Sequence, residues 1–430
     1  MSQEKEIAYQ SRFDEFAQQK LFRALPEKEQ QTVRRLGFQY RLTFQELREL
    51  VEMTCDFSMW EEKDLNDQWA MLEEAHSTRG VQRKKKLLEA LKTNWQKLLK
   101  EETQYPQREK RSQLPIGYGR KRVVTQIQSK PILGPCPVAS QKTSCCNLWT
   151  IDAVEGCAFG CSYCSIQTFY DPNNISVTGN LADKLKDIEL DPQRRYHIGT
   201  GQSSDSLAFG NKGGVLDAQL EFAQNHSNVI WEFKTKSKNI GYFLTTPVPK
   251  NFFVSWSLNP QTFIDHEEHG SASLDERLSS ARQLADRGIK VGFHFHPLVH
   301  YRGWRQDYCT LIERIIDMFS PDEIATISLG TLTFTRQVIK SLRIKGQKTK
   351  ILQMPMVDAA GKLSYPFEVK EELFQTVWKA FTPWHDAVFF YCCMEDPLLW
   401  DRLFGFHYET NAQFENALFD ALCEKLQVAA

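Results

Sequence analysis

Long hydrophobic runs are missing from this sequence. No uninterrupted apolar stretch reaches the roughly 18 residues that a membrane-spanning helix needs, and the chain opens on the polar and charged segment Met1 to Phe13 rather than on a signal peptide. We therefore expect a cytoplasmic protein with no membrane partner.

An excess of charge of either sign is also missing. The 53 Lys and Arg residues nearly balance the 54 Asp and Glu residues, and the net charge is −1. An anionic partner such as nucleic acid would have to be recognised by a local basic patch, because the chain as a whole does not attract one. With 430 residues, 41% of them hydrophobic, the chain can bury one large core and a smaller one.

Cysteine is too sparse for a disulfide scaffold. The chain has eleven cysteines, and without a secretion signal they are expected to be thiols or metal ligands. Three of them fall within eight residues, which makes this grouping the main clue to function.

The first part of the chain, residues 1–125, is predicted to be a helical N-terminal domain. Thr43 and Glu46 form a capping box ahead of an apolar helical pattern. Its last part, Arg79–Arg122, holds fourteen basic and four acidic residues. Such a segment either forms a solvated surface or contacts DNA or another nucleic acid, and both readings stay open.

From Asn147 onward, β-rich apolar runs alternate with amphipathic helical patterns, which is typical of β/α units and a parallel sheet. One expected helix, Leu274–Asp286, begins at a second capping box, Ser273 with Glu276. The pattern predicts an α/β protein with a partial (β/α)6 TIM-type barrel over residues 126–345 and an α-rich closing region over residues 346–430. The six expected strands are Leu148–Ala153, Tyr196–Thr200, Val229–Lys234, Phe252–Leu258, Lys290–Phe295 and Glu323–Leu329.

Cys157, Cys161 and Cys164 follow the first expected strand with Cys-x3-Cys-x2-Cys spacing. Three thiolates on one loop can ligate three irons of a [4Fe–4S] cluster and leave the fourth iron open. An open iron can chelate S-adenosylmethionine, and one electron then releases a 5′-deoxyadenosyl radical. The alternative is a structural zinc site, but zinc needs four ligands, and the nearest other cysteines lack the paired spacing of such sites.

The sequence resembles the radical S-adenosylmethionine superfamily and, more narrowly, the spore photoproduct lyase family, over roughly residues 152–311. The segments that carry the resemblance are the cysteine motif, Phe233–Lys236, Ser257-Leu-Asn259, and Gly288–Phe293 with Pro297 and Trp304. The resemblance implies that Lys236, Ser257 and Asn259 hold S-adenosylmethionine. It also implies a reducing partner such as flavodoxin or ferredoxin.

The loop after the second expected strand is a further candidate for the cofactor rim. Glycines permit close approach of the backbone to a ligand, and hydroxyl and carboxylate groups can bind an ammonium group or hydroxyls. A plain strand-to-helix loop remains the alternative. The candidate residues are Gly201, Gln202, Ser203 and Asp205.

Two positions depart from the family pattern. Gln202 stands where the lyases carry a cysteine that returns a hydrogen atom to the substrate radical, and Ser165 stands where they have a second tyrosine beside Tyr163. An amide N–H bond is too strong to replace a thiol. The departures predict that turnover either consumes S-adenosylmethionine or ends in a product other than restored thymines, with Tyr163 left as a candidate hydrogen donor.

His294 and His296 lie two residues apart in the fifth expected strand, so alternation puts both on one face, directed into the barrel. Inward imidazoles can bind an anionic substrate or transfer a proton, or they can form a satisfied pair in the core. Three hypotheses follow: a radical enzyme that repairs or modifies DNA, one that acts on a peptide or small molecule, and a non-catalytic iron–sulfur protein.

Overall fold

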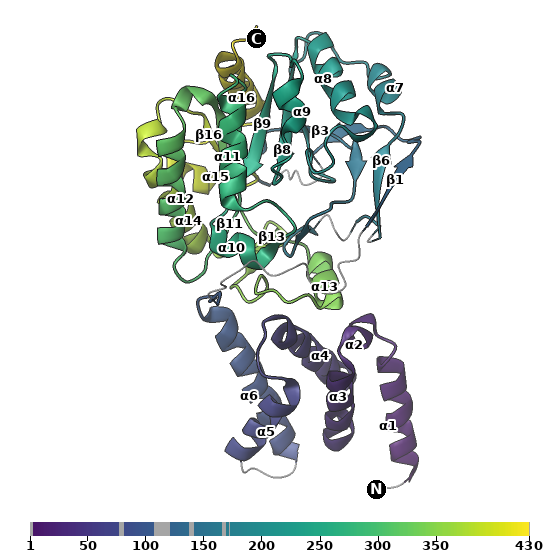
Figure 1. Cartoon of the computed structure of the whole chain (residues 1–430). Helices are drawn as coiled ribbons and strands as arrows, with labels where there is room; N and C mark the ends of the chain where they lie inside the picture. The colour runs from purple at the N-terminus through teal and green to yellow at the C-terminus, as the bar shows by residue number, and fades with distance from the viewer. Residues whose placement is uncertain are drawn as a thin grey trace. The chain divides into compact units, whose positions relative to one another are not determined.

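The computed structural model describes residues 3–76, 81–106, 121–136, 142–165, 169–171 and 173–429. The chain forms two compact units (Figure 1). Unit 1 comprises Met1–Gln104 and Phe334–Ser364, and unit 2 comprises Tyr105–Thr333 and Tyr365–Ala430. These bounds differ from the expected divisions at residues 125 and 345, because the segment 334–364 packs with the N-terminal helices.

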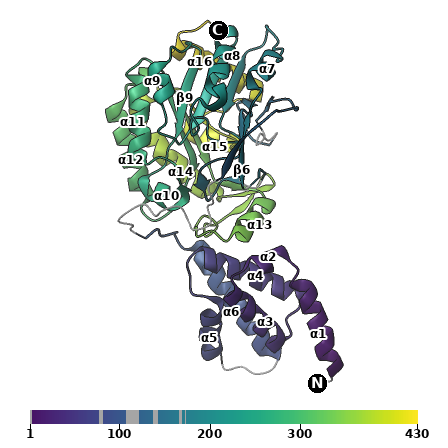
Figure 2. The same cartoon turned by 45° about the vertical axis from the view of Figure 1, so that its right-hand side comes forward.

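Unit 2 is built on one curved, eight-stranded sheet, which confirms the predicted α/β partial barrel (Figures 1 and 2). All six expected strands are present, and they lie side by side in chain order with parallel pairing. A parallel strand on one edge and an antiparallel strand on the other complete the sheet. In sheet order the strands are β16 (Phe390–Cys392), β12 (Ile324–Thr331), β11 (Val291–Leu298), β9 (Phe252–Ser257), β8 (Val229–Thr235), β7 (Tyr196–Thr200), β3 (Trp149–Ile151) and β2 (Leu133–Pro135).

The strands are apolar on one side and polar on the other. On β8, Trp231 and Phe233 contact Phe222 and Phe243 of neighbouring helices. Glu232 alternates with these rings and points to the opposite side, where it meets His294 of β11. The outer side of the sheet is therefore a conventional apolar core, whereas the lumen of the barrel is lined by polar groups.

Helices pack along the sheet, as Figure 1 shows for α8, α9 and α11. The predicted capping box, Ser273 with Glu276, begins α11. None of the described helices is long and apolar enough to cross a membrane. The helices of unit 2 are α7 (Leu181–Lys186), α8 (Val215–Asn225), α9 (Gly241–Thr245), α10 (Gln261–Glu267), α11 (Leu274–Ala285), α12 (Trp304–Met318), α14 (Phe367–Ala380), α15 (Pro397–Phe404) and α16 (Asn411–Leu426).

The last helix, α16, lies at the end of the barrel where the strands begin. Its Glu415 accepts a hydrogen bond from Asn147, which precedes β3, at 2.8 Å. Asp420 pairs with Arg195, which precedes β7, and Lys425 donates to the carbonyl of Pro321 just before β12. Helix α16 therefore ties together the starts of three strands.

Unit 2 also contains two small sheets. β1 (Arg122–Gln126), β6 (Asn174–Thr178) and β4 (Val154–Glu155) form one of them, and β5 (Gly160–Cys161) with β10 (Glu268–His269) forms the other. The second sheet matters for function because β5 contains one of the motif cysteines.

Unit 1 is a helical domain completed by a distant piece of chain. The capping box predicted for Thr43 and Glu46 begins α4. From the later segment, helix α13 packs against α2 and α4, and the backbone N–H of Thr349 donates to the carbonyl of Met59 at 2.9 Å. The helices are α1 (Gln3–Phe16), α2 (Lys20–Ala24), α3 (Glu27–Tyr40), α4 (Phe44–Met59), α5 (Leu65–Ala75), α6 (Val81–Lys100) and α13 (Arg336–Lys345), with β14 (Val357–Ala359) and β15 (Lys362–Ser364) paired antiparallel.

A buried ion pair joins the two pieces of unit 1. Asp56 on α4 is 1% exposed and accepts two hydrogen bonds of 2.8 Å from the guanidinium of Arg343 on α13. Trp95 of α6 donates a third hydrogen bond to the same carboxylate at 3.0 Å. Because an unpaired carboxylate is strongly disfavoured in such a place, Arg343 is needed for this core.

Replacing Arg343 by Met should therefore lower the free energy of unfolding of unit 1 by about 3 kcal/mol, because Asp56 would remain buried without its cation. Urea denaturation at neutral pH would measure the loss. The control is Lys85→Met, since the Lys85 side chain is 78% exposed in an i,i+4 pair with Glu89 and should contribute less than about 0.5 kcal/mol. Equal stabilities of the two variants would contradict the role given to the buried pair.

Candidate active site

The three motif cysteines lie in a tight loop between β4 and the segment after β5. Gly156 at the start of the loop has a φ of +83°, and a Cβ there would lie 3.0 Å from the carbonyl oxygen of Asn174. Cys157 follows, and its Sγ accepts from the backbone N–H of Phe159 at 3.4 Å. Cys161 on β5 is buried, whereas Cys157 and Cys164 are partly exposed. The loop therefore presents thiols around a bend that needs glycine at its entry.

The segment Glu267–His269 holds this loop in place. β5 and β10 pair so that Cys161 faces Glu268. Beside them, the backbone N–H of Ser162 donates to the carbonyl of Glu267 at 2.8 Å, and the Ser162 hydroxyl bonds the Glu267 carboxylate. The position of the second cysteine is thus fixed by backbone pairing to a distant part of the chain.

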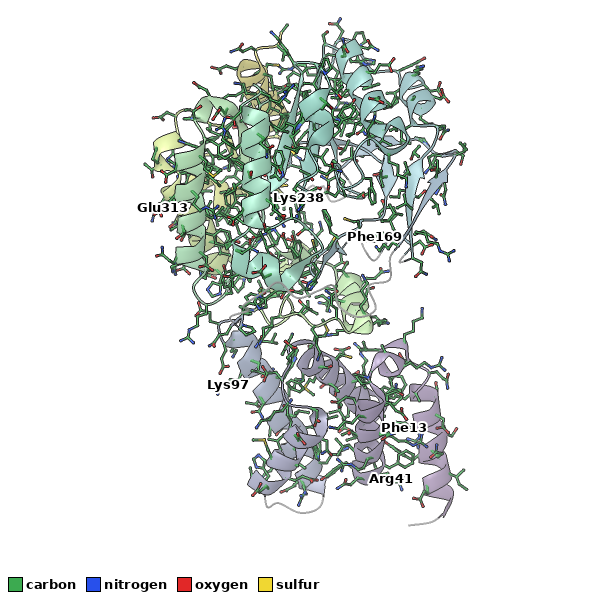
Figure 3. The ribbon with its side chains drawn as sticks, in the orientation of Figure 1. Phe13, Arg41, Lys97, Phe169, Lys238 and Glu313 are labelled. Atoms are coloured by element: carbon green, nitrogen blue, oxygen red, sulfur yellow. The ribbon has the colours of Figure 1, made fainter. Side chains whose placement is uncertain are left out.

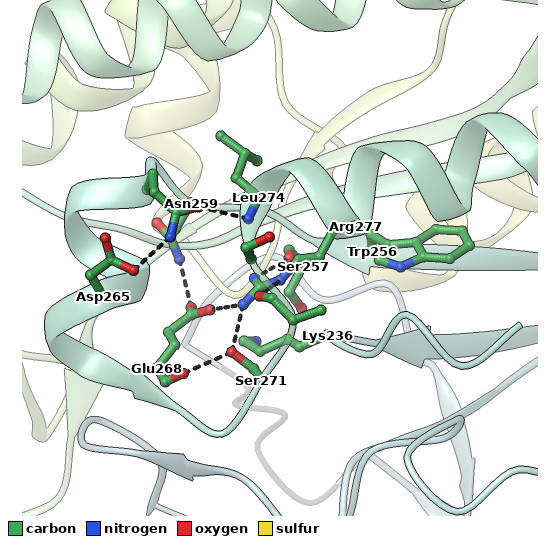
Figure 4. A network of polar contacts seen from close by, with 12 residues as sticks. Lys236, Trp256, Ser257, Asn259, Asp265, Glu268, Ser271, Leu274 and Arg277 are labelled. Atoms are coloured by element: carbon green, nitrogen blue, oxygen red, sulfur yellow. Dashed lines mark hydrogen bonds and ion pairs between the residues drawn. The ribbon is translucent and has the colours of Figure 1, made fainter. Parts of the chain in front are cut away.

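Glu268 and Arg277 form a fully buried ion pair behind the loop (Figure 4). Arg277 also donates to the carbonyl of Ser257 at 2.8 Å and to the hydroxyl of Ser271 at 2.7 Å. Burial raises the pKa of Glu268, but Arg277 and then Lys236 outweigh it, and the pKa falls to about 2. Glu268 is therefore a fixed negative charge at any physiological pH.

Tyr163 and Lys236 both interact with the carboxylate of Glu268. The Tyr163 hydroxyl donates to Glu268 at 2.6 Å, and Lys236 places its Nζ 5.9 Å from the centre of the Tyr163 ring. Burial, followed by the nearby Glu268 charge, raises the pKa of Tyr163 well above its usual value. The phenol consequently stays protonated, with its hydrogen directed at Glu268.

The chemistry of the loop fits an iron–sulfur cluster. Burial raises the pKa of Cys157 to about 12 and that of Cys161 well above its usual value, so without a metal both stay thiols, although Lys236 opposes the shift at each. A bound cationic cluster would supply the compensating charge that thiolates need here. Within the described ranges, no three Cys, His, Asp or Glu side chains converge on one metal ion, whereas a cubane needs each thiolate on a different iron.

The loop after β7 supports Lys236 rather than presenting its acid outward. Asp205 accepts from the backbone N–H of Lys236 at 2.6 Å and from the Thr235 hydroxyl at 2.8 Å. Ser203 donates to the carbonyl of Val154 at 2.7 Å, which connects this loop to the cysteine loop. The side chains of Asp205 and Ser203 are thus occupied by protein groups.

Gly201 and Gln202 differ from these two residues. Gly201 has a φ of +90°, and a Cβ there would lie 2.6 Å from the Lys234 carbonyl oxygen, so only glycine fits. Gln202 is partly exposed. Within the described part of the chain, no hydrogen bond to its amide is found.

Ser257 and Asn259, at the end of β9, contribute in different ways. Asn259 is fully buried; its amide donates to Glu268 at 3.0 Å, and its carbonyl accepts from the Tyr308 hydroxyl at 2.8 Å. Ser257 is partly exposed and uses its backbone carbonyl for Arg277. The sequence groups both with Lys236, and in the structure all three surround the Glu268–Arg277 pair (Figure 4).

His294 and His296 lie together in the barrel lumen, with ring centres 5.4 Å apart. Both bond the hydroxyl of Ser328 on β12, His296 at 3.1 Å. The other nitrogen of His294 lies 2.7 Å from Glu232. Lys234 is 3.4 Å from the same carboxylate, so the two imidazoles belong to a buried chain of polar groups.

The charges of this chain are set by its members. Burial raises the pKa of Glu232, but Lys234 and His294 outweigh it and lower the pKa well below its usual value. Burial lowers the pKa of His294. Burial also lowers the pKa of His296, and the neighbouring His294 and Lys234 lower it further, to well below its usual value. At neutral pH the lumen therefore holds an ionised Glu232 and two neutral imidazoles.

The sequence interpretation missed Glu267, Glu268 and Arg277, which hold the cysteine loop, and Glu232, which organises the lumen. Glu232 had a usable signal, because it is a charged residue between Trp231 and Phe233 in a strand expected to be buried. Glu267 and Glu268 carried no such sequence signal, because two adjacent glutamates are typical of a solvent-exposed turn.

The predicted basic segment is partly neutralised in the structure. On α6, Lys84 lies 3.0 Å from Glu46, and Arg83 lies 3.9 Å from Glu73. Residues 79–80 and 107–120 of the segment lie outside the described residues. The described part of the segment thus fits a solvated, acid-paired helix surface better than a free basic stripe.

The neutral imidazoles predict an acid-sensitive stability. Folding lowers the pKa of these histidines below the usual value of 6.5. Just below pH 6.5 the unfolded chain therefore binds protons at these positions and the folded chain does not. Protonation stabilises the unfolded chain, so the free energy of unfolding falls as the pH decreases from 6.5. Each such histidine contributes a slope of up to about 1.4 kcal/mol per pH unit.

We expect His296→Gln to flatten the decline of unfolding free energy between about pH 6.5 and 5.5, as measured by urea denaturation at several pH values. The control is Gln283→Ala, an exposed position on α11 whose replacement removes no titratable group and should leave the slope as in the wild type. Parallel slopes for the wild type and the His296 variant would contradict a neutral His296.

A second expectation concerns Glu268. Glu268→Gln removes the charge that faces Arg277, whose side chain is 0% exposed, and should lower the free energy of unfolding by about 3 kcal/mol. Chemical denaturation at neutral pH would measure it. Glu313→Gln, an exposed position on α12 (Figure 3), is the control and should change stability by less than about 0.5 kcal/mol. A Glu268 variant as stable as this control would show that the buried pair does not hold the loop.

Comparison with known sequences identifies relatives of this chain. The model of the family described as spore photoproduct lyase matches residues 140–360, which is 221 of the 430 residues. The spore photoproduct lyase of Clostridium acetobutylicum is 25% identical over 228 residues, covering 50% of this chain and 65% of that protein. The Bacillus subtilis enzyme is 24% identical over 214 residues, covering 47% and 61%. The chain thus spans just under two thirds of the length of these relatives.

Comparison with solved structures shows the same fold. A spore photoproduct lyase complexed with dinucleoside spore photoproduct superimposes with a TM-score of 0.53 at 21% identity, over 63% of this chain and 82% of that one. A variant of spore photoproduct lyase with bound AdoMet and the same dinucleoside gives a TM-score of 0.53 at 21% identity, over 62% and 81%. On the match to the family model, this chain belongs to the spore photoproduct lyase family of radical S-adenosylmethionine proteins.

Proposed function

We propose that this protein is a cytoplasmic radical S-adenosylmethionine enzyme that abstracts a hydrogen atom from a substrate in DNA. The observation that carries the proposal is the cysteine loop, held by backbone pairing beside a buried cation and a buried carboxylate. In this function a [4Fe–4S] cluster on Cys157, Cys161 and Cys164 supplies one-electron cleavage of S-adenosylmethionine to a 5′-deoxyadenosyl radical. A reducing partner such as flavodoxin or ferredoxin delivers the electron.

The chain's own residues provide binding and orientation. Lys236, whose backbone N–H donates to Asp205 at 2.6 Å, would pair through its ammonium group with the carboxylate of S-adenosylmethionine. Ser257 and Gln202 are partly exposed and are assigned to cofactor or substrate contacts. Asn259, Ser203 and Asp205 are already engaged by protein groups and act as positioning residues.

Tyr163 is the one candidate hydrogen donor among the predicted site residues. Its hydroxyl donates to Glu268 at 2.6 Å. To quench a substrate radical, the O–H hydrogen would have to leave this hydrogen bond and pass, as proton and electron together, to the substrate carbon. The charge-assisted hydrogen bond to the ionised carboxylate opposes that step. We therefore expect substrate radicals to be quenched poorly by Tyr163 alone, in keeping with the absence of a thiol at position 202.

The polar lumen favours a second candidate function. Glu232, His294 and His296 fill the barrel interior with hydrogen-bonding groups, which suit a polar peptide or small-molecule substrate in the same architecture. A third possibility, a non-catalytic iron–sulfur protein, is excluded if reduction of the reconstituted protein releases 5′-deoxyadenosine.

The experiment is anaerobic reconstitution followed by incubation with S-adenosylmethionine, reductant and dinucleoside spore photoproduct. We expect 5′-deoxyadenosine from the wild type, with stoichiometric consumption of S-adenosylmethionine or a product other than restored thymines. Gln202→Cys should gain thymine-restoring activity, because a thiol S–H bond gives up hydrogen readily. Thymine and 5′-deoxyadenosine are quantified together by liquid chromatography.

Two controls accompany this assay. Cys161→Ala should lose the visible absorption of the cluster and all 5′-deoxyadenosine, whereas Lys236→Met should keep the absorption but bind S-adenosylmethionine at least tenfold more weakly, as one charge-assisted contact is lost. Efficient catalytic thymine restoration by the wild type would overturn the claim about Gln202. Release of 5′-deoxyadenosine with no thymine from either protein would favour the peptide or small-molecule alternative.

A further inference from the structure

Unit 1 contains a cavity that belongs to neither the cysteine loop nor the barrel lumen. Its volume is about 640 Å³, and its walls come from the N-terminal helices and from α13 with β15. Cavities of roughly 300–1,000 Å³ accommodate ligands the size of a nucleotide or larger. The cavity is formed entirely within unit 1, so its shape follows from one compact body.

One wall of the cavity is aromatic. Phe16, Phe22, Phe44 and Trp95 line it. Phe44 is 48% exposed although it is a large apolar side chain, and it meets Phe16 edge-on at 5.3 Å between ring centres. A half-exposed ring at the mouth of an aromatic cavity offers a stacking surface for a flat ligand.

The remaining walls are cationic. Four basic residues line the cavity, Arg48, Arg336, Lys340 and Arg343, against the single acid Glu52. Arg48 and Arg343 both pair with Glu52, and Arg343 also pairs with Asp56. Within the described part of the chain, neither Arg336 nor Lys340 has an ion-pair partner, and both are exposed. They lie one helical turn apart on α13, so their charges project on the same side.

The segment that supplies these cations is basic throughout. From Phe334 to Met356 the chain has six basic residues and no acidic one. On α6, by comparison, Arg83 and Lys84 are paired with glutamates. Arg336 and Lys340 thus place two exposed cations, without an ion-pair partner among the described residues, beside the aromatic wall.

We infer that this cavity binds single-stranded DNA, with an unstacked base against Phe44 and adjacent phosphates on Arg336 and Lys340. A flat ring next to two or more anionic groups is the combination that a nucleotide segment offers. An acyl chain with one carboxylate would match the apolar wall, but of the two cations without an ion pair, Arg336 and Lys340, it would leave one without a partner. The inference rests on the proposed function only in choosing DNA as the source of the nucleotides.

The test is fluorescence anisotropy of the full-length protein with fluorescein-labelled (dT)12 over a range of salt concentrations. Arg336→Gln/Lys340→Gln should weaken binding and reduce the slope of log affinity against log salt by about 1.4, because each phosphate contact on a single strand contributes about 0.7. Phe44→Ala should weaken binding by about tenfold or more and leave the slope unchanged, because it removes stacking and no charge. These positions are exposed enough for the variants to fold.

Matched controls separate this site from general electrostatics. Arg12→Gln/Arg35→Gln removes the same charge from exposed positions of unit 1 that do not line the cavity, and it should bind (dT)12 as the wild type does. Lys85→Gln/Lys97→Gln tests the exposed face of α6, where Lys97 is labelled in Figure 3. A loss there equal to that of the α13 pair, or wild-type binding by the Phe44 and α13 variants, would overturn the inference.

Two further readouts keep the conclusions distinct. Failure of excess unlabelled (dT)12 to displace the labelled strand would show that the fluorescein and not the DNA is bound, and would overturn the DNA assignment. Release of 5′-deoxyadenosine by the wild type without DNA is assayed separately. Absence of that release together with Phe44-dependent binding of (dT)12 would sink the proposed radical chemistry while supporting the binding site.

Discussion

The buried pair of Arg277 and Glu268 is the interaction on which the cysteine loop depends. Arg277 draws together the end of β9, the turn before α11 and the carboxylate of Glu268. Glu268 in turn pairs through its backbone with Cys161 and receives the hydroxyl of Tyr163. Because both charged groups are shielded from water, each can be stabilised only by the other, and each constrains the other's position. The cysteine loop, which is bonded to Glu268, is held in place as a result.

The lumen shows the same principle with different consequences. Glu232 is surrounded by Lys234, His197 and His294, so that one ionised carboxylate organises side chains from three strands. An apolar lumen would be easier to build, and a polar one is stable only when its hydrogen bonds are nearly complete.

Much of the barrel was predictable from sequence. The strands were found because buried parallel strands are continuous apolar runs, and the cysteine spacing identified its loop without further information. The anchors of that loop were not predictable, since Glu268 contacts a residue about one hundred positions earlier and Arg277 acts through Glu268. For a similar reason the sequence left both readings of the basic run open, because the glutamates that pair with Lys84 and Arg83 lie on α4 and α5.

The two-part construction of unit 1 has a consequence for how the protein is made. Its N-terminal helices leave the ribosome first, yet the Arg343 that neutralises Asp56 is synthesised only after almost all of the barrel strands. During that interval Asp56 lacks its partner Arg343. The first hundred residues therefore stay incompletely packed until a segment more than two hundred residues downstream has been synthesised. Completion of the helical unit is therefore tied in time to synthesis of the barrel, and neither segment can be removed alone without exposing the other's core.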